Sequence, residues 1–187
     1  MFERIEVNLA GNPLSGKSKS GRHLEHVWKF RTLTGSDVLQ QEASKRGLIL
    51  KGRPDYTKFQ RHLRCGQPTF IADAVAKIDH PRVANIGARN RLDIEASRRR
   101  GGVTIALVCP IEIRFDRRPA DDPKYPDNFE EFLAVEEREY NDPDPFGQHT
   151  QWAIEHADHV IDTSGSVESM LRDLDNIMGK YLPGQQI

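Results

Sequence analysis

Short apolar segments alternate with amphipathic segments along the chain. Strands are predicted at 5–9, 32–33, 83–86, 103–109 and 159–161. The segment 103–109 is nearly continuously apolar, which is typical of a central strand buried on both faces. Strands that alternate with helices predict an α/β fold around a parallel sheet.

Helices are predicted where apolar residues recur at helical spacing. Their ranges are 18–30, 37–46, 55–64, 69–78, 91–100, 111–117, 128–140, 147–156 and 167–181. The last has the clearest periodicity, with Ser166 as its predicted N-cap. Proline-rich segments at 119–127 and 141–145 interrupt the pattern, and the first predicts a loop that serves as a lid.

Composition limits the class of protein. A chain of 187 residues with 37% hydrophobic residues suits one α/β domain with one core. The formal net charge of −1 offers no global attraction for nucleic acid or an anionic membrane, so any phosphate binding must be local. Two distant cysteines, Cys65 and Cys109, make a disulfide framework or a zinc site improbable. No signal peptide or membrane-spanning segment is evident, so a cytoplasmic protein is expected.

One motif carries clear chemistry. The segment Gly11-Asn12-Pro13-Leu14-Ser15-Gly16-Lys17-Ser18 matches G-x-x-x-x-G-K-[ST] between the first predicted strand and helix. These residues are expected to bind the phosphates of a nucleoside triphosphate, with Lys17 reaching the β- and γ-phosphates and Ser18 ligating Mg²⁺. The alternative is an ordinary Gly/Pro/Ser turn that contains a lysine. Gly21, within the predicted helix, is expected to permit close packing against the sheet.

Other motifs narrow the class of phosphate-loop protein. The NKxD motif with which GTPases read guanine does not occur. The predicted strand 83–86 supplies no carboxylate of the kind that motor and AAA-type ATPases use to hold Mg²⁺. The small nucleotide kinases are the class of phosphate-loop protein that remains.

Further segments, in order and spacing, match such kinases: 36–39, 42–47, 59–64, 87–90 with Glu95, 106–118, 121–123, 129–132, 136–139 and 157–166. From the phosphate loop to Val167 the sequence resembles the adenylate-kinase-like nucleotide kinases, of the nucleoside monophosphate or dephospho-CoA kinase type. The resemblance implies a P-loop NTPase three-layer sandwich with a five-stranded parallel sheet, in a single domain over 1–187. It also implies a helical acceptor-binding insertion at about 37–79 and a short lid at about 114–140.

The implied activity is transfer of the γ-phosphate of ATP, with Mg²⁺, to a nucleotide-like acceptor. Such an acceptor is a nucleoside or deoxynucleoside monophosphate, or dephospho-CoA. The resemblance places Arg114, Arg117 and Arg118 where they clamp the triphosphate, and the first two are the candidate catalytic arginines. The alternative is a basic, solvated helix end.

The resemblance gives Asp37 a role in orienting or deprotonating the acceptor, or in holding metal. It could equally be a helix N-cap, as could Ser36. Arg64 and Arg89 are expected to meet the acceptor's phosphate, or to form ordinary surface ion pairs. Ser164 and Gly165 are expected in a turn beside the nucleotide base.

The sequence departs from the family pattern at residue 86. Relatives read approximately Ile-Asp-Gly-Ile-Arg-Asn where this chain reads Asn85-Ile86-Gly87-Ala88-Arg89-Asn90. If the missing aspartate normally supports Mg²⁺ through water, Ile86 should lower activity. Asn85 lies on the opposite face of its strand and is not expected to substitute. In addition, Arg118 is followed directly by Pro119, which alters the lid.

Three interpretations follow: an active kinase in which Asp37 holds the metal, a slow kinase with a divergent acceptor, or a nucleotide-binding protein that no longer transfers phosphate. The expected partner is a small-molecule nucleotide acceptor. Neither nucleic acid nor a membrane is expected as a partner, because the basic residues are dispersed. The oligomeric state, including a homo-oligomer, stays open, as does the preference for ATP or GTP.

Overall fold

The computed structural model describes residues 4–120, 122, 125–140 and 142–184. Its strands are β1 (Ile5–Ala10), β2 (Arg31–Thr34), β3 (Arg82–Ile86), β4 (Val103–Val108) and β5 (His159–Asp162). Its helices are α1 (Lys17–His26), α2 (Gly35–Lys45), α3 (Arg53–Gly66), α4 (Phe70–Ala76), α5 (Arg91–Arg98), α6 (Ile111–Asp116), α7 (Phe129–Tyr140), α8 (Thr150–Glu155) and α9 (Val167–Tyr181). Each predicted strand and helix is confirmed, with ends that differ by a few residues.

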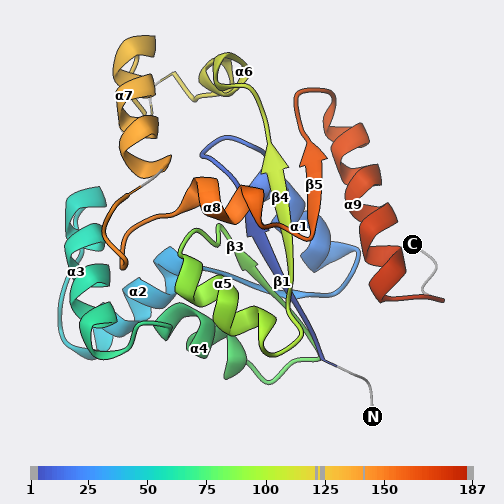
Figure 1. The fold of residues 1–187 in the computed structure, drawn as a ribbon, viewed down its shortest axis with the longest axis horizontal. Coiled ribbons are helices and arrows are strands. Elements are labelled where there is room, and N and C mark those ends of the chain that lie inside the picture. The colour runs from blue at the N-terminus through green and yellow to red at the C-terminus, as the bar shows by residue number, and fades with distance from the viewer. Residues whose placement is uncertain (1–3, 121, 123–124, 141, 185–187) are drawn as a thin grey trace.

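The strands form a five-stranded parallel sheet in the order β2-β3-β1-β4-β5. Strand β1 lies at the centre, where Leu9 pairs with Ile86 on one side and Ile105 on the other. Because the strands are parallel, their carboxyl ends meet at one edge of the sheet. The connections from β1 to α1, from β3 to α5 and from β4 to α6 therefore begin at the same edge (Figure 1).

Helices cover both faces of the sheet, which confirms the predicted three-layer sandwich. Helices α1 and α9 pack on one face, where Leu24, Trp28 and Leu174 join the main core. Helices α4, α5 and α8 pack on the other, and Ile94 and Ala153 are buried there. The layers are held chiefly by burial of apolar side chains that the sequence spaces at helical intervals.

Two further groups of helices extend from the sandwich. Helices α2, α3 and α4 share a separate core, formed by Val38, Leu39, Ala43, Phe59, Leu63, Phe70 and Ile71. Helices α6 and α7 stand beyond the carboxyl ends of β4 and β5 (Figure 1). There Phe115 of α6 packs edge-on against Phe129 and Phe132 of α7. Within the described part of the chain, no helix has the length and apolar character needed to cross a membrane.

Candidate functional site

Residues 11–18, the phosphate loop, connect β1 to α1 through a backbone that needs glycine. Gly11 has a φ of 131°, and a Cβ there would lie 2.3 Å from the carbonyl oxygen of Leu107. Gly16 has a φ of 94° and is the N-cap of α1, where no side chain caps the helix. The first N–H groups of α1 therefore face the loop, and they form a positive end suited to an anion.

Lys17 and Ser18 lie where the motif predicts them. Lys17 is buried, and its Nζ donates to the carbonyl oxygens of Gly11, at 2.9 Å, and Asn12, at 2.5 Å. The ammonium group is thus held directly over the loop. Ser18 is exposed in the first turn of α1 and lines the adjoining cleft.

A cleft of about 1490 Å³ runs from the phosphate loop, past the ends of β2 and β3, to α3. Its charged lining among the described residues is strongly positive. The cations are Lys17, Lys19, Arg22, Lys51, Arg64, Arg89 and Arg117, and the acids are Asp93 and Asp122. A cleft with this charge favours anionic ligands along its whole length.

Arg64 lies in this lining, but its charge is already neutralised. Its side chain is fully buried, and its Nη2 lies 2.5 Å from Oδ2 of Asp93. Its Nη1 donates to the carbonyl oxygen of Pro68 and to Oδ1 of Asn90. Burial raises the pKa of the Asp93 carboxyl, and the Arg64 guanidinium opposes that rise. Of the two alternatives predicted for Arg64, an ion pair is present, but it is buried rather than on the surface, and contact with an acceptor phosphate stays a prediction.

Arg89 remains directed at the cleft. It is half-buried after β3, and its Nη1 donates to Oε1 of Gln148 at 2.7 Å. The backbone N–H of His149 also donates to the carbonyl oxygen of Arg89, at 2.8 Å. Gln148 thus holds the side chain of Arg89, and His149 holds its main chain.

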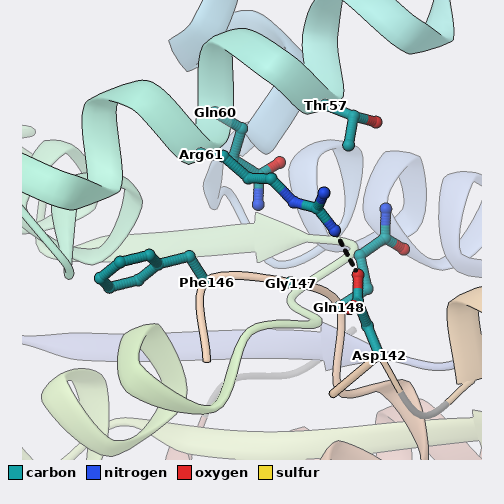
Figure 2. A pocket seen from close by; sticks show the side chains of 7 residues that line it. All are labelled: Thr57, Gln60, Arg61, Asp142, Phe146, Gly147 and Gln148. Carbon is teal, nitrogen blue, oxygen red and sulfur yellow. Dashed lines mark hydrogen bonds and ion pairs between the residues drawn. The ribbon is translucent and has the colours of Figure 1, made fainter. Parts of the chain in front are cut away.

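The segment 142–148 lies beside α3 and forms a roof over this part of the molecule. Arg61 of α3 reaches across a small pocket of about 70 Å³ to Oδ2 of Asp142, at 3.0 Å (Figure 2). Its Nε lies 2.9 Å from Oδ2 of Asp144. From the other side, Nδ2 of Asn90 donates to the carbonyl oxygen of Gly147 at 2.8 Å. The sequence analysis identified no role for this segment beyond a proline-rich loop.

The three lid arginines have separate environments. Arg117 lines the cleft, and its Nη2 donates to the carbonyl oxygen of Thr163 at 2.6 Å. Arg114 is 5% exposed and pairs with Glu136, with Nη1 and Oε2 2.5 Å apart. Arg118 stacks over Phe115, its Cζ lying 3.8 Å from the ring centroid. Arg117 is thus the one of these three that lines the cleft, whereas Arg114 and Arg118 contact residues of the lid, and the predicted clamp on a triphosphate stays a prediction.

Comparisons with known proteins agree with this architecture. No family model matches the chain. A protein of Archaeoglobus fulgidus described as a UPF0200/UPF0201 protein is 27% identical over 200 residues, an alignment that covers 100% of this chain. The chain spans 59% of the length of that archaeal protein.

Solved structures are similar over nearly the whole chain. Shikimate kinase from Acinetobacter baumannii, in complex with shikimate, has a TM-score of 0.59 and 17% identity, covering 99% of this chain and 96% of its own. Shikimate kinase from Aquifex aeolicus has a TM-score of 0.56 and 18% identity, covering 96% and 99%. A gluconokinase from Sinorhizobium meliloti has a TM-score of 0.56 and 15% identity, covering 98% and 99%. The chain has the P-loop kinase fold.

Within this P-loop fold, Asp37 occupies the first turn of α2. Its Oδ2 accepts hydrogen bonds from the backbone N–H and the hydroxyl of Thr34, both at 2.8 Å, and Thr34 Oγ1 accepts from the N–H of Asp37. This reciprocal pair is a capping box in which Thr34 is the N-cap. The predicted N-cap at Ser36 or Asp37 is therefore wrong by two or three residues. Asp37 is exposed and is not among the residues that line the cleft, so the geometry favours its capping role over a role as base.

The turn after β5 also lines the cleft, beside the phosphate loop. Gly165 lines the cleft, whereas the N–H of Ser164 donates to Oδ1 of Asp162 at 2.8 Å. This bond holds the pKa of the Asp162 carboxyl below its ordinary value. Thr163, the first residue of this predicted turn, donates its hydroxyl to the carbonyl oxygen of Ser15 at 3.0 Å. It thereby joins the turn to the phosphate loop.

Ile86 lies where the resemblance noted in the sequence implies an aspartate, and its side chain packs on α1. A Cβ at Gly21 would lie 3.0 Å from Cδ1 and Cγ1 of Ile86, which confirms the predicted close packing of Gly21. Asn85 points to a neighbouring strand, where its Nδ2 lies 3.5 Å from Oδ1 of Asn8. Asn85 also lines the cleft, and the expectation that it does not substitute for a carboxylate stays a prediction.

The P-loop fold implies a Mg²⁺ ion, and the residues present fit one that is held mainly by phosphate oxygens and water. Ser18 supplies a hydroxyl in the cleft. Across the described ranges, no group of three or more His, Cys, Asp or Glu side chains is arranged to hold a metal. Mg²⁺ commonly keeps several waters and takes few protein ligands, so one hydroxyl with substrate phosphates suits it.

Proposed function

We propose that the chain is a kinase that transfers the γ-phosphate of ATP, bound with Mg²⁺, to a small anionic, nucleotide-like acceptor. One observation carries the proposal: a single positively lined cleft joins the phosphate loop to Arg89 beneath the 142–148 roof. The donor and the acceptor of a phosphoryl transfer must meet in such a continuous space. Phosphoryl transfer depends mainly on positioning and on neutralisation of charge, and this lining supplies both.

On the donor side, the N–H groups of the phosphate loop bind the β-phosphate, and Lys17 leaves Gly11 and Asn12 to reach the transferred group. Ser18 is the residue that would hold Mg²⁺, which neutralises charge on the β- and γ-phosphates when bound. Arg117 adds a second cation at the nucleotide end. Gly165 lies beside the expected position of the base.

On the acceptor side, Arg89 binds the anionic group of the acceptor. The carboxylates described in the cleft offer little general-base capacity, because Asp93 pairs with Arg64 and Asp122 belongs to the lid. A phosphate oxygen is already ionised and needs no base, whereas a hydroxyl acceptor needs a group that takes its proton. This difference favours a nucleoside or deoxynucleoside monophosphate over dephospho-CoA, shikimate or gluconate.

A panel of acceptors tests the proposal. The protein is incubated with ATP, Mg²⁺ and each nucleoside and deoxynucleoside monophosphate, with dephospho-CoA, shikimate and gluconate as hydroxyl-bearing arms. We expect phosphorylated product from at least one monophosphate, and no product with the Lys17→Met variant. Tight ATP binding without product from any acceptor would contradict the proposal. Product from a hydroxyl-bearing compound alone would overturn the assignment of the acceptor.

A second candidate, a nucleotide-binding protein with little transferase activity, is favoured by Ile86. The test is a matched pair of variants, Ile86→Asp and Ile86→Asn, which differ in charge but hardly in size. A gain in turnover with Asp and not with Asn supports loss of activity at this position. Equal turnover in both variants and the native chain would exclude Ile86 as the cause of weak transfer.

A further inference from the structure

Helix α7 and the phosphate loop meet at the side chain of Glu136. One turn before it, Phe132 packs against Phe115 of α6, with ring centroids 5.5 Å apart. Residues four apart share a face of a helix, so Glu136 points to the same buried side as Phe132. The two are 5% and 2% exposed. A carboxylate at this degree of burial is stabilised only by charged or hydrogen-bonding partners.

Two partners share a single oxygen of this carboxylate. Arg114 Nη1 lies 2.5 Å from Oε2 of Glu136, and Asn12 Nδ2 donates to the same oxygen at 2.9 Å. Arg114 Nη1 also donates to the carbonyl oxygen of Pro13 at 3.2 Å. Since Asn12 and Pro13 are consecutive residues of the phosphate loop, α6 and α7 together hold that loop from outside.

The hydrogen bonds of Glu136 and Arg114 reach the phosphate loop next to the residue with its least favourable backbone conformation. Leu14 has a φ of 63°, in the left-handed region that side chains other than glycine rarely adopt. Such conformations persist where the surrounding structure holds them in place. Asn12 and Pro13 are held on one side of Leu14, and Ser15 is held on the other by the Thr163 hydroxyl.

We propose that Glu136 is a positioning residue that keeps the phosphate loop in its anion-binding conformation through Asn12 and Arg114. Helix α7 and the donor site are then coupled, because movement of α7 away from α6 releases the loop. The ATP-affinity part of this inference rests on the proposed function. The loop geometry can be measured without any ligand.

Hydrogen exchange of amides 11–18 in the ligand-free protein and calorimetric ATP binding form the test. The variant Glu136→Gln keeps the shape of the side chain and removes its charge. We expect faster exchange in the loop and a rise in the Kd for ATP of about tenfold or more, since small misplacements are costly in a phosphate cradle. Asn12→Ala, which keeps the buried ion pair intact, should shift both measurements in the same direction. Glu137→Gln, an exposed neighbour on α7, is the matched control and should change neither.

A double variant separates positioning from stability. Replacing both charges in Arg114→Met/Glu136→Met leaves no unpaired buried charge, so the protein should fold with a stability near that of the native chain. The hydrogen bonds of these two side chains with the phosphate loop are still lost, so hydrogen exchange of the loop amides should remain fast. Native exchange and native ATP affinity in the double variant and in Asn12→Ala would overturn the proposal. If the native protein itself fails to bind ATP, the proposed function is wrong, and loop exchange alone decides the role of Glu136.

Discussion

Arg64 and Asp93 form an ion pair that is buried on both sides, with Nη2 and Oδ2 2.5 Å apart and the side chains 0% and 4% exposed. It joins α3, the longest helix of the α2–α4 group, to α5 beneath the sheet. Asp93 also accepts from the N–H of Ala72, at 3.0 Å, so the pair ties α4 as well. Arg64 therefore joins α3, α4 and α5 beside the cleft that it lines.

The first prediction concerns this pair. Arg64→Met should lower the free energy of unfolding by about 3–5 kcal/mol, because it leaves the Asp93 carboxylate buried and unpaired. The double variant Arg64→Met/Asp93→Leu should recover much of that loss. Urea denaturation measures both. A small loss of stability, together with a large rise in acceptor KM, would instead restore the role in acceptor binding that the sequence suggested.

Asp37 gives a second prediction. Asp37→Ala should cost about 0.5–2 kcal/mol of stability through loss of the capping box, with Thr34→Ala as the matched change at the other half of the box. The turnover number should stay within a few-fold of the native value in both. A fall in kcat of more than about a hundredfold for Asp37→Ala alone would indicate a base or metal role, since general bases contribute about 10²–10⁴-fold.

The third prediction concerns two arginines of the lid, Arg117 and Arg118. Arg117→Met should weaken ATP binding about tenfold or more, because hydrogen bonds from charged groups contribute about 1.5–3 kcal/mol. Arg118→Met removes the same charge at a residue that does not line the cleft, and it should leave the Kd for ATP nearly unchanged. Calorimetry with each variant separates the two. Equal losses for both would mean that the lid closes differently when ATP is bound.

The fourth prediction concerns Gln148, which accepts a hydrogen bond from Arg89. Gln148→Leu removes the acceptor of the Arg89 Nη1 bond, so the arginine should lose its orientation and the KM for the acceptor should rise about tenfold. The KM for ATP should not change, because the described hydrogen bonds of the Gln148 side chain do not reach the phosphate loop. Gln151→Leu on α8 is the control, since its amide bonds only Glu155 among the described hydrogen bonds of its side chain. An effect confined to ATP would refute this division of the cleft.

The Asp162 carboxyl gives a prediction on pH. Its pKa is lowered by the N–H of Ser164, so the folded state binds its proton less readily than the unfolded state does. Its contribution to stability is present above the ordinary pKa of aspartate and is lost as the pH falls through the lowered value. Nuclear magnetic resonance titration should show Asp162 titrating below the ordinary pKa of an aspartate side chain. An ordinary pKa at Asp162 would mean that the Ser164 bond is absent in solution.

The fold was predictable because its signals are local. A strand buried on both faces must be apolar, as residues 103–108 are, and the turn from β1 to α1 must contain glycine where Gly11 approaches Leu107. These requirements involve neighbouring residues, or a backbone that admits few side chains. They can therefore be recognised without knowledge of the tertiary structure.

The partners of the arginines were not predictable in the same way. Arg64 meets Asp93, 29 residues later, and Arg114 meets Glu136, 22 residues later. Composition does not indicate which carboxylate an arginine will face. Glu136 did carry a signal: it follows Phe132 by one helical turn, and a charged residue on an apolar face indicates a buried partner.

The positive lining of the cleft has a consequence for how ligands arrive. The chain as a whole has a formal net charge of −1, although the described cleft holds five more cations than acids. The remaining surface must therefore carry an excess of negative charge, which makes the molecule strongly dipolar. A diffusing nucleotide is drawn toward the mouth of the cleft, and salt screens this attraction over about 10 Å. The ionic strength of the cell thus becomes a control on how fast the site fills.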